Sequence, residues 1–230
     1  MLLTPKDHER VRAAVEAAEA KTSGEICCIL ARECSDYWEA PLAWAAGVAL
    51  IGPAAAMLLG LRPAMASSLM GGWTAAHAGF IDVAVGQALT AYVVLQTALF
   101  VLVALIVSWP PIRRALTPGP LKHERVRRRA EEQFVARGLQ LTEGRTGVLI
   151  FASLAERRVE VIADQGIASK VAPEAWAGVC AALVDGMKKR DAGAGFAAAI
   201  ERAGALLAEH APRAPGDRNE LPDTVIELEH

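Results

Sequence analysis

Three charged residues stand where their chemistry could be combined: Glu25, Arg145 and Asp164. Each flanks a short apolar run of the kind that forms a buried strand, so the pairing of those runs decides whether the side chains meet. Two carboxylates beside one guanidinium fit a divalent-cation site, a phosphate site or a structural ion pair. Glu25 and Asp164 are therefore the candidate catalytic or metal-binding pair, with Ca²⁺ or Mg²⁺ as the ion they would hold.

A purely structural role fits the same residues and stays open. Asp164 would then close the turn at Gly166, and Glu25 would pair with Arg145. The sequence has no D-x-D pair, no C-x5-R phosphatase loop and no Walker-type glycine loop. No histidine lies in the hairpin around Ser153 to act as its base. These absences favour the structural role, and no cofactor is firmly indicated.

The four cysteines do not form a recognisable site. They are Cys27, Cys28, Cys34 and Cys180. None makes a C-x-x-C pair, and no histidine stands at zinc-finger spacing. Because Cys27 and Cys28 are adjacent in an apolar run, we expect them to be small buried hydrophobes.

Three short runs predict the strands that position the charged residues. They are residues 25–31, 146–152 and 158–163. A long connection containing a helix joins the first two, which favours parallel pairing, and a tight turn joins the last two into a hairpin. The starts of the first two strands and the end of the third should then share one edge. This brings Glu25, Arg145 and Asp164 toward one another.

Helices complete an α/β domain with a small mixed sheet in a three-layer-like arrangement. They are predicted after Thr4, over residues 122–139, from Pro173 and after Asp191. This cytosolic domain is assigned to residues 1–38 and 111–210. Residues 211–230 are polar and rich in proline, which predicts a flexible tail. The last three residues resemble the remnant of an expression tag.

A stretch of seventy residues holds only two charges, Arg62 and Asp82. Within it, residues 41–61 and 83–109 are each long enough to cross a hydrocarbon core of about 30 Å as a helix. They predict a two-helix transmembrane hairpin over residues 39–110 that interrupts the domain. A buried helical hairpin in a soluble protein is the alternative. A transporter is disfavoured because two helices without a mid-membrane charge offer no ion path.

Positive charge after the second span sets the orientation. The connecting loop carries one arginine, so both termini should be cytoplasmic. Six basic residues are expected to face the lipid headgroups: Arg113, Arg114, Lys122, Arg125, Arg128 and Arg129. A solvated helix face is the alternative for those in residues 122–139. A net charge of −2 argues against a nucleic-acid partner.

Several motifs resemble the TPM domain family. They are TSGEI at 22–26, GRTGVLIF at 144–151, SLAERRVEVIADQGI at 153–167, Trp176, and DAGAGF at 191–196. The resemblance covers about residues 4–38 and 121–210, and the run from Leu154 to Ile167 is its most specific part. It is strongest to the bacterial branch in which the domain is joined to membrane helices, which implies the bacterial inner membrane. The hairpin placed directly after the first strand departs from many relatives.

The resemblance implies the fold far better than the function. Relatives are linked to photosystem II repair, to weak acid-phosphatase activity and to accessory roles at receptors. Our first hypothesis is a non-catalytic binding, assembly or quality-control module in the membrane, whose partner is another membrane protein or a second copy. The alternative is a membrane-bound metal-dependent phosphatase or hydrolase that uses the acidic edge.

Overall fold

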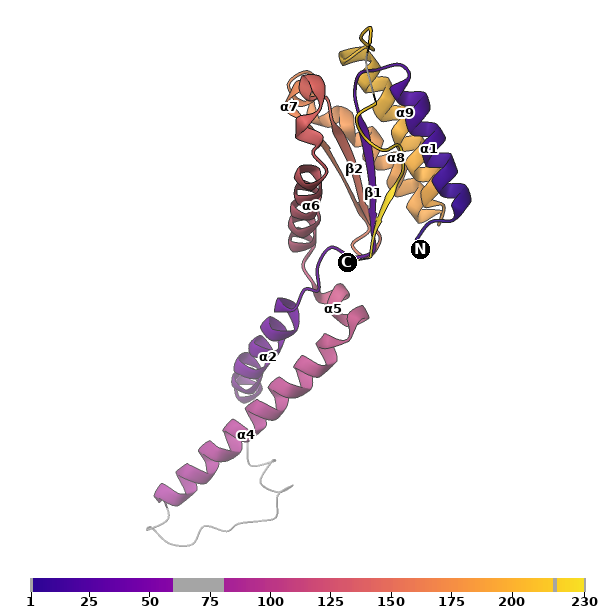
Figure 1. Ribbon diagram of the computed structural model, residues 1–230. Helices are drawn as coiled ribbons and strands as arrows, with labels where there is room; N and C mark the ends of the chain where they lie inside the picture. The colour runs from indigo at the N-terminus through magenta and orange to yellow at the C-terminus, as the bar shows by residue number, and fades with distance from the viewer. Residues whose placement is uncertain (1, 60–80, 217–218, 230) are drawn as a thin grey trace. The chain divides into compact units, whose positions relative to one another are not determined.

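The computed structural model divides the chain into two compact units (Figure 1). It describes residues 2–59, 81–216 and 219–229. Unit 1 comprises Met1–Asp36 and Pro118–His230, and unit 2 comprises Tyr37–Thr117. From the sequence, the apolar insertion was expected to end at residue 110. Unit 2 itself ends at Thr117 because the short helix α5 (Pro110–Leu116) packs with it, and the bounds of the transmembrane hairpin stay a prediction.

A four-stranded sheet with the order β3-β2-β1-β4 forms the centre of unit 1. Its strands are β1 (Ile26–Ala31), β2 (Val148–Ser153), β3 (Arg158–Ala163) and β4 (Ile226–Leu228). β1 runs parallel to β2, with Ile26 opposite Val148. β2 runs antiparallel to β3, with Val148 opposite Ala163. The predicted crossover and hairpin are confirmed, and so is the small mixed sheet of an α/β fold.

The helices predicted after Thr4 and Asp191 begin directly after these capping residues, whereas the helix predicted over residues 122–139 runs from Gly119 to Ala136. The following helices are described in unit 1. They are α1 (Pro5–Glu19), α6 (Gly119–Ala136), α7 (Gln165–Ala168), α8 (Ala177–Lys188) and α9 (Ala192–His210), with 3₁₀ turns at Leu139–Leu141, Glu143–Arg145 and Pro173–Trp176. Thr4 and Asp7 form a capping box at α1, and the Asp191 side chain accepts from the N–H of Ala194 at the start of α9. α8 and α9 approach closely at two glycines, where a Cβ on Gly186 would lie 2.3 Å from the Cα of Gly195.

Helices cover both faces of the sheet, so every residue of β1 is buried (Figure 1). Successive side chains of a strand point to opposite faces. Cys28 packs on the side of α1, α8 and α9, whereas Cys27 packs on the side of α6. Both thiols are free and buried, and burial raises the pKa of Cys27 to about 11. The two cysteines are hydrophobic core residues, as predicted.

The C-terminal segment corrects the prediction of a flexible tail over residues 211–230. β4 extends the sheet beyond β1, with Ile226 opposite Ile29. The carboxylate of Glu227 accepts hydrogen bonds at 2.8 and 2.9 Å from two backbone N–H groups near the N-terminus. Val225 is buried in the core. Polar composition concealed this order, because the edge of β1 supplies backbone partners that no local pattern reveals.

The described residues of unit 2 form two long apolar helices and one short helix that carries two arginines. They are α2 (Glu39–Leu58), α4 (Ile81–Ser108) and α5. α2 packs along α4, and a Cβ on Gly52 would lie 3.6 Å from the Leu99 side chain. This is an ordinary van der Waals distance, so the glycine does not set how closely the two helices approach. The loop predicted at residues 62–82 falls almost wholly outside the described residues.

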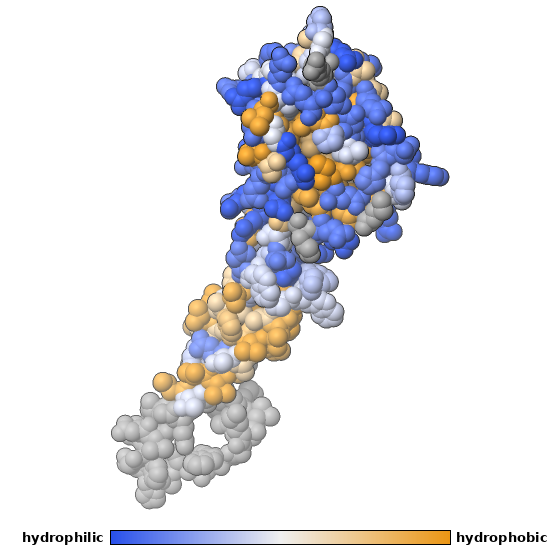
Figure 2. Space-filling model, in the orientation of Figure 1, coloured by the Kyte–Doolittle hydropathy of each residue, from blue (hydrophilic) through white to orange (hydrophobic). Residues whose placement is uncertain are grey.

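Large apolar side chains cover the outside of α2 and α4 (Figure 2). Leu50, Leu95 and Leu105 are 64%, 57% and 68% exposed. Over the described side chains, no single helix is both long and apolar enough to cross a membrane. A bent pair, Tyr92–Ser108 with Pro110–Leu116 at 97°, reaches the required length and composition. The apolar helical pair is therefore observed, and the transmembrane hairpin stays a prediction.

Candidate functional site

Arg145 and Asp164 meet at the edge of the sheet where β2 begins and β3 ends. Arg145 closes a 3₁₀ turn three residues before β2 begins, and Asp164 directly follows β3. The Arg145 Nε and Nη2 atoms lie 3.1 Å from the Asp164 Oδ2 and Oδ1 atoms, respectively. The Asp164 side chain is 6% exposed and that of Arg145 is 53% exposed. The predicted juxtaposition of these two residues is thus a two-pronged ion pair on a buried carboxylate.

The same carboxylate also starts α7. Asp164 is the N-cap, and its Oδ1 atom accepts from the N–H of Gln165 at 2.7 Å. Next to it, a Cβ on Gly166 would lie 2.2 Å from the carbonyl oxygen of Gly144, so the turn before β2 and α7 are in close contact. Both oxygens of Asp164 already accept hydrogen bonds. A cation at this carboxylate would have to compete with Arg145 and with the helix cap.

Glu25 shares this sheet edge but lies two strands away from Asp164. Its carbonyl oxygen accepts from Val148 N at 2.8 Å, and the carbonyl oxygen of Gly147 accepts from Asp164 N at 2.9 Å. Two strand spacings place the backbones of Glu25 and Asp164 roughly 10 Å apart. The Glu25 side chain is buried, and its Oε1 atom accepts from the N–H of Glu220 at 3.3 Å.

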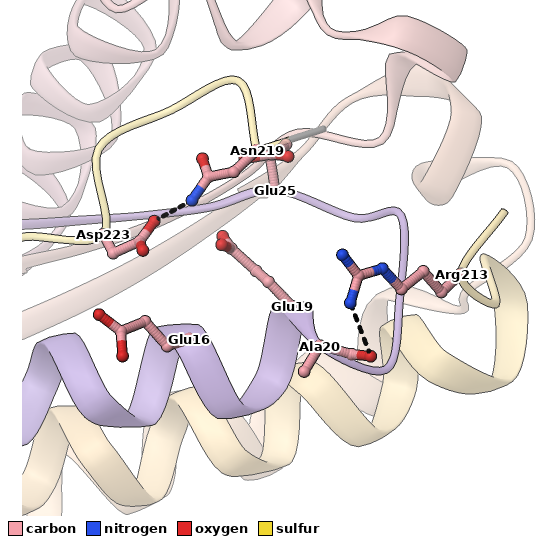
Figure 3. Close-up of a pocket in the computed structure, with 7 residues that line it drawn as sticks. All are labelled: Glu16, Glu19, Ala20, Glu25, Arg213, Asn219 and Asp223. Carbon is pink, nitrogen blue, oxygen red and sulfur yellow. Dashed lines mark hydrogen bonds between the residues drawn. The ribbon is translucent and has the colours of Figure 1, made fainter. Parts of the chain in front are cut away.

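Glu25 contributes to an acidic pocket of about 180 Å³ between α1 and the C-terminal segment (Figure 3). Its lining residues are Glu16, Glu19, Ala20, Glu25, Arg213, Asn219 and Asp223. Asn219 donates to the Asp223 carboxylate, and Arg213 Nη1 donates to the carbonyl oxygen of Ala20 at 3.3 Å. The C-terminal segment thus supplies part of this wall, together with the guanidinium of Arg213.

Glu19 is the most perturbed acid of the pocket. Its pKa is raised to about 8, first by burial and then by the neighbouring carboxylates of Glu25 and Asp223. Its Oε1 atom accepts from the N–H of Ile26 at 2.9 Å, which opposes the rise. Glu19 therefore holds a proton near neutral pH. The protonated carboxyl still accepts the hydrogen bond from the Ile26 N–H group at the start of β1.

The acidic pocket was missed from the sequence. Glu19 belongs to an ordinary amphipathic helix, and Asp223 lies in the segment predicted to be flexible. Of the pocket residues, only Glu25 was predicted to belong to a site. Its predicted partner, Asp164, lies two strands away along the same edge of the sheet. In the part of the chain that the structure describes, no three histidine, cysteine, aspartate or glutamate side chains are grouped as a metal site would require. The metal and catalytic roles of Glu25 and Asp164 stay predictions.

A second polar cluster lies at the opposite edge of the sheet. The Ser153 hydroxyl donates to the Glu156 carboxylate, whose Oε1 atom accepts from the N–H of Cys34 at 3.3 Å. Ser153 is fully buried and Glu156 is 9% exposed. Burial raises the pKa of Cys34 to about 12, so its thiol stays protonated. The cluster stabilises the tip of the β2–β3 hairpin and offers no accessible nucleophile.

The six predicted lipid-facing basic residues have two different settings. Four lie on α6: Lys122, Arg125, Arg128 and Arg129. Within this group, Arg128 and Arg129 pair with Glu132 at 3.3 Å, which offsets part of the charge. Arg113 and Arg114 lie on α5 in unit 2. Arg113 is only 9% exposed, and its guanidinium carbon lies 6.0 Å from the centre of the Trp38 ring.

Comparison with known proteins yields a structural neighbour. No family model and no curated protein matches the chain. The NMR structure of the BA42 protein from the psychrophilic bacterium Bizionia argentinensis is similar to it, with a TM-score of 0.54 and 18% sequence identity. The similarity covers 98% of this chain and 94% of that chain. At this identity the likeness shows the fold alone.

Proposed function

We propose that the protein is a TPM-type domain anchored in the bacterial inner membrane, with both termini cytoplasmic. We propose further that it acts as a non-catalytic binding, assembly or quality-control module for another membrane protein. The observation that carries the proposal is the apolar outer surface of α2 and α4, next to a domain with a conventional core. The motifs at residues 22–26 and 144–167 support the family assignment, and the similarity to BA42 is compatible with it.

The many exposed apolar side chains along α2 and α4 support a lipid environment for these helices. Soluble monomers rarely expose contiguous apolar patches larger than a few hundred Å². α4 has 28 residues, and at about 1.5 Å per residue it is roughly 42 Å long. α2 has 20 residues, about the number that crosses a hydrocarbon core, although the part of it with described side chains, Glu39–Ala55, is shorter than a full span. The excess of arginine after α4 over the single arginine in residues 59–81 supports cytoplasmic termini.

The side chains of unit 1 favour binding over catalysis. Asp164 is engaged by Arg145 and by the cap of α7, Ser153 is sealed from solvent, and the Cys34 thiol stays protonated. The alternative, a phosphatase that uses Ca²⁺ or Mg²⁺, would need Asp164 to exchange these hydrogen bonds for a metal ion. A protein partner needs only the exposed surfaces of the two units.

Membrane anchoring is tested by carbonate extraction of membranes that contain the full chain. The protein should stay in the pellet at alkaline pH and be released only by detergent. A reporter fused after His230 should signal the cytoplasm, and one placed at Ser68 should signal the outside. Release by carbonate alone would contradict the anchor, and exchanged reporter signals would contradict the orientation.

The non-catalytic role is tested with a generic phosphate ester. Purified protein is assayed with Mg²⁺, with Ca²⁺ and without either ion, beside the Asp164→Asn and Glu25→Gln variants. We expect no turnover above the buffer rate under any condition. After mild solubilisation, one integral membrane protein or a second copy of this chain should be recovered at a constant ratio. Turnover that either substitution abolishes would favour the hydrolase instead.

A further inference from the structure

Arg113 stands out as a buried charge in unit 2. It lies in α5, five residues after α4 ends at Ser108. The residue is only 9% exposed, although a guanidinium is among the most polar groups of a protein. Its guanidinium lies against the face of Trp38, at 6.0 Å from the ring centre. This cation–π contact replaces only part of the hydration that burial removes.

Across the described part of the chain, the guanidinium of Arg113 has no hydrogen-bond acceptor and no acidic partner. Its Nε atom is buried without a hydrogen bond. The hydroxyl of Thr117 donates to the backbone carbonyl oxygen of Arg113 at 2.7 Å. This hydrogen bond does not involve the Arg113 guanidinium. A buried charge without a counter-charge is strongly unfavourable. A bound anion would supply the counter-charge that the guanidinium of Arg113 lacks.

Tryptophans indicate where this anion comes from. Trp38 and Trp109 are 62% and 66% exposed, and Trp44 is 45% exposed. The Trp44 Nε1 atom donates to the carbonyl oxygen of Leu116 at 3.2 Å, so this ring is tied to the end of α5. Exposed tryptophans at the end of an apolar helical pair are typical of the boundary between hydrocarbon and headgroups. Phosphate groups of phospholipids lie at that depth.

We infer that Arg113 and Trp38 form a binding site for the phosphate of an anionic phospholipid headgroup. The planar guanidinium presents two N–H groups to two phosphate oxygens, which an ammonium cannot match. Trp38 holds the guanidinium plane in position. The inference rests on the proposed membrane anchor and adds to it a specific lipid contact. Free phosphate shares the chemistry of the headgroup but lacks the acyl chains that α2 and α4 would contact.

The test uses the full chain in nanodiscs with equal amounts of phosphatidylglycerol and phosphatidylcholine. Native mass spectrometry measures which lipids stay bound after release. We expect phosphatidylglycerol to be enriched by about fivefold or more. Arg113→Gln should abolish the enrichment and Arg113→Lys should retain part of it. Arg202→Gln, which makes the same change at an exposed residue of α9 in unit 1, is the matched control and should leave it unchanged.

A second measurement separates lipid from free phosphate. In detergent, added phosphatidylglycerol should raise the thermal midpoint of the wild-type protein, whereas phosphatidylcholine or inorganic phosphate should not. Equal enrichment of the two lipids, or an unchanged enrichment in Arg113→Gln, overturns the inference. An equal response to inorganic phosphate also overturns it. If carbonate releases the wild-type protein, the membrane anchor itself has failed, whereas an anchored protein without lipid preference refutes only the Arg113 site.

Discussion

Leucine side chains have opposite surroundings in the two units. In unit 1, Leu149 and Leu183 are completely buried between the sheet and its helices. In unit 2, Leu95 and Leu105 are 57% and 68% exposed on α4. Helices from distant parts of the chain cover the sheet of unit 1, whereas the described residues of unit 2 leave the outer faces of α2 and α4 open. The same residue type is a core component in one unit and, in our proposal, a lipid contact in the other.

The largest expected effect comes from truncating one leucine in each unit. Leu149→Ala should lower the free energy of unfolding of unit 1 by about 2–5 kcal/mol, because it leaves a cavity in a closed core. Leu105→Ala removes the same atoms from an open face and should change the free energy of unfolding of unit 2 by less than about 0.5 kcal/mol. Hydrogen exchange in mild detergent reports each value in its own unit, at the β1 and β2 amides for Leu149→Ala and at the α4 amides for Leu105→Ala. Equal losses in the two variants would remove the distinction between the units.

Introducing a lysine at an exposed leucine of each unit tests whether only unit 2 faces lipid. Leu95→Lys places an ammonium near the middle of α4 and should disfavour membrane insertion by about 2.5–3.5 kcal/mol. Leu141 is 79% exposed on unit 1, and Leu141→Lys is the matched control. We expect carbonate to release a larger fraction of the first variant than of the wild type, with no change for the second. An unaffected Leu95→Lys variant would argue that water already surrounds this face.

Local patterns were sufficient to predict most of unit 1. The all-apolar run of β1 indicated a strand buried on both faces, and the turn between β2 and β3 indicated a hairpin. From these, the meeting of Arg145 and Asp164 followed by topology alone. The charge-poor stretch likewise indicated two long apolar helices, which are α2 and α4. In each case the signal lay within the segment that forms the element.

Contacts between distant segments could not be predicted in this way. β4 pairs with β1 although almost two hundred residues separate them, and its polar surroundings indicate disorder when considered alone. The raised pKa of Glu19 depends on the same segment, because Asp223 faces it from there. The burial of Arg113 was also unforeseen, since its contact with Trp38 joins residues 75 positions apart in the sequence.

Removing one charge from each unit tests how the two differ electrostatically. Asp164→Asn breaks a two-pronged ion pair and weakens a helix cap, and should destabilise unit 1 by about 1–3 kcal/mol. Arg113→Gln removes a buried charge without a partner, so in detergent free of anionic lipid it should be neutral or stabilising. Thermal unfolding of the two variants is the measurement. A strongly destabilised Arg113→Gln variant would show that the guanidinium already has a partner in unit 2.

A dependence of stability on pH is expected in unit 1. The pKa of Glu19 is about 8 in the folded chain, and its ordinary value is 4.5. Between these values the folded state holds one more proton than the unfolded state. The free energy of unfolding therefore falls as the pH rises from about 4.5 to about 8. Glu19→Gln keeps the hydrogen bond to Ile26 but cannot titrate, so it should flatten this slope in urea unfolding at a series of pH values. Glu16→Gln, on the exposed side of the pocket, should keep the wild-type slope; if it flattens the slope equally, Glu19 is not its origin.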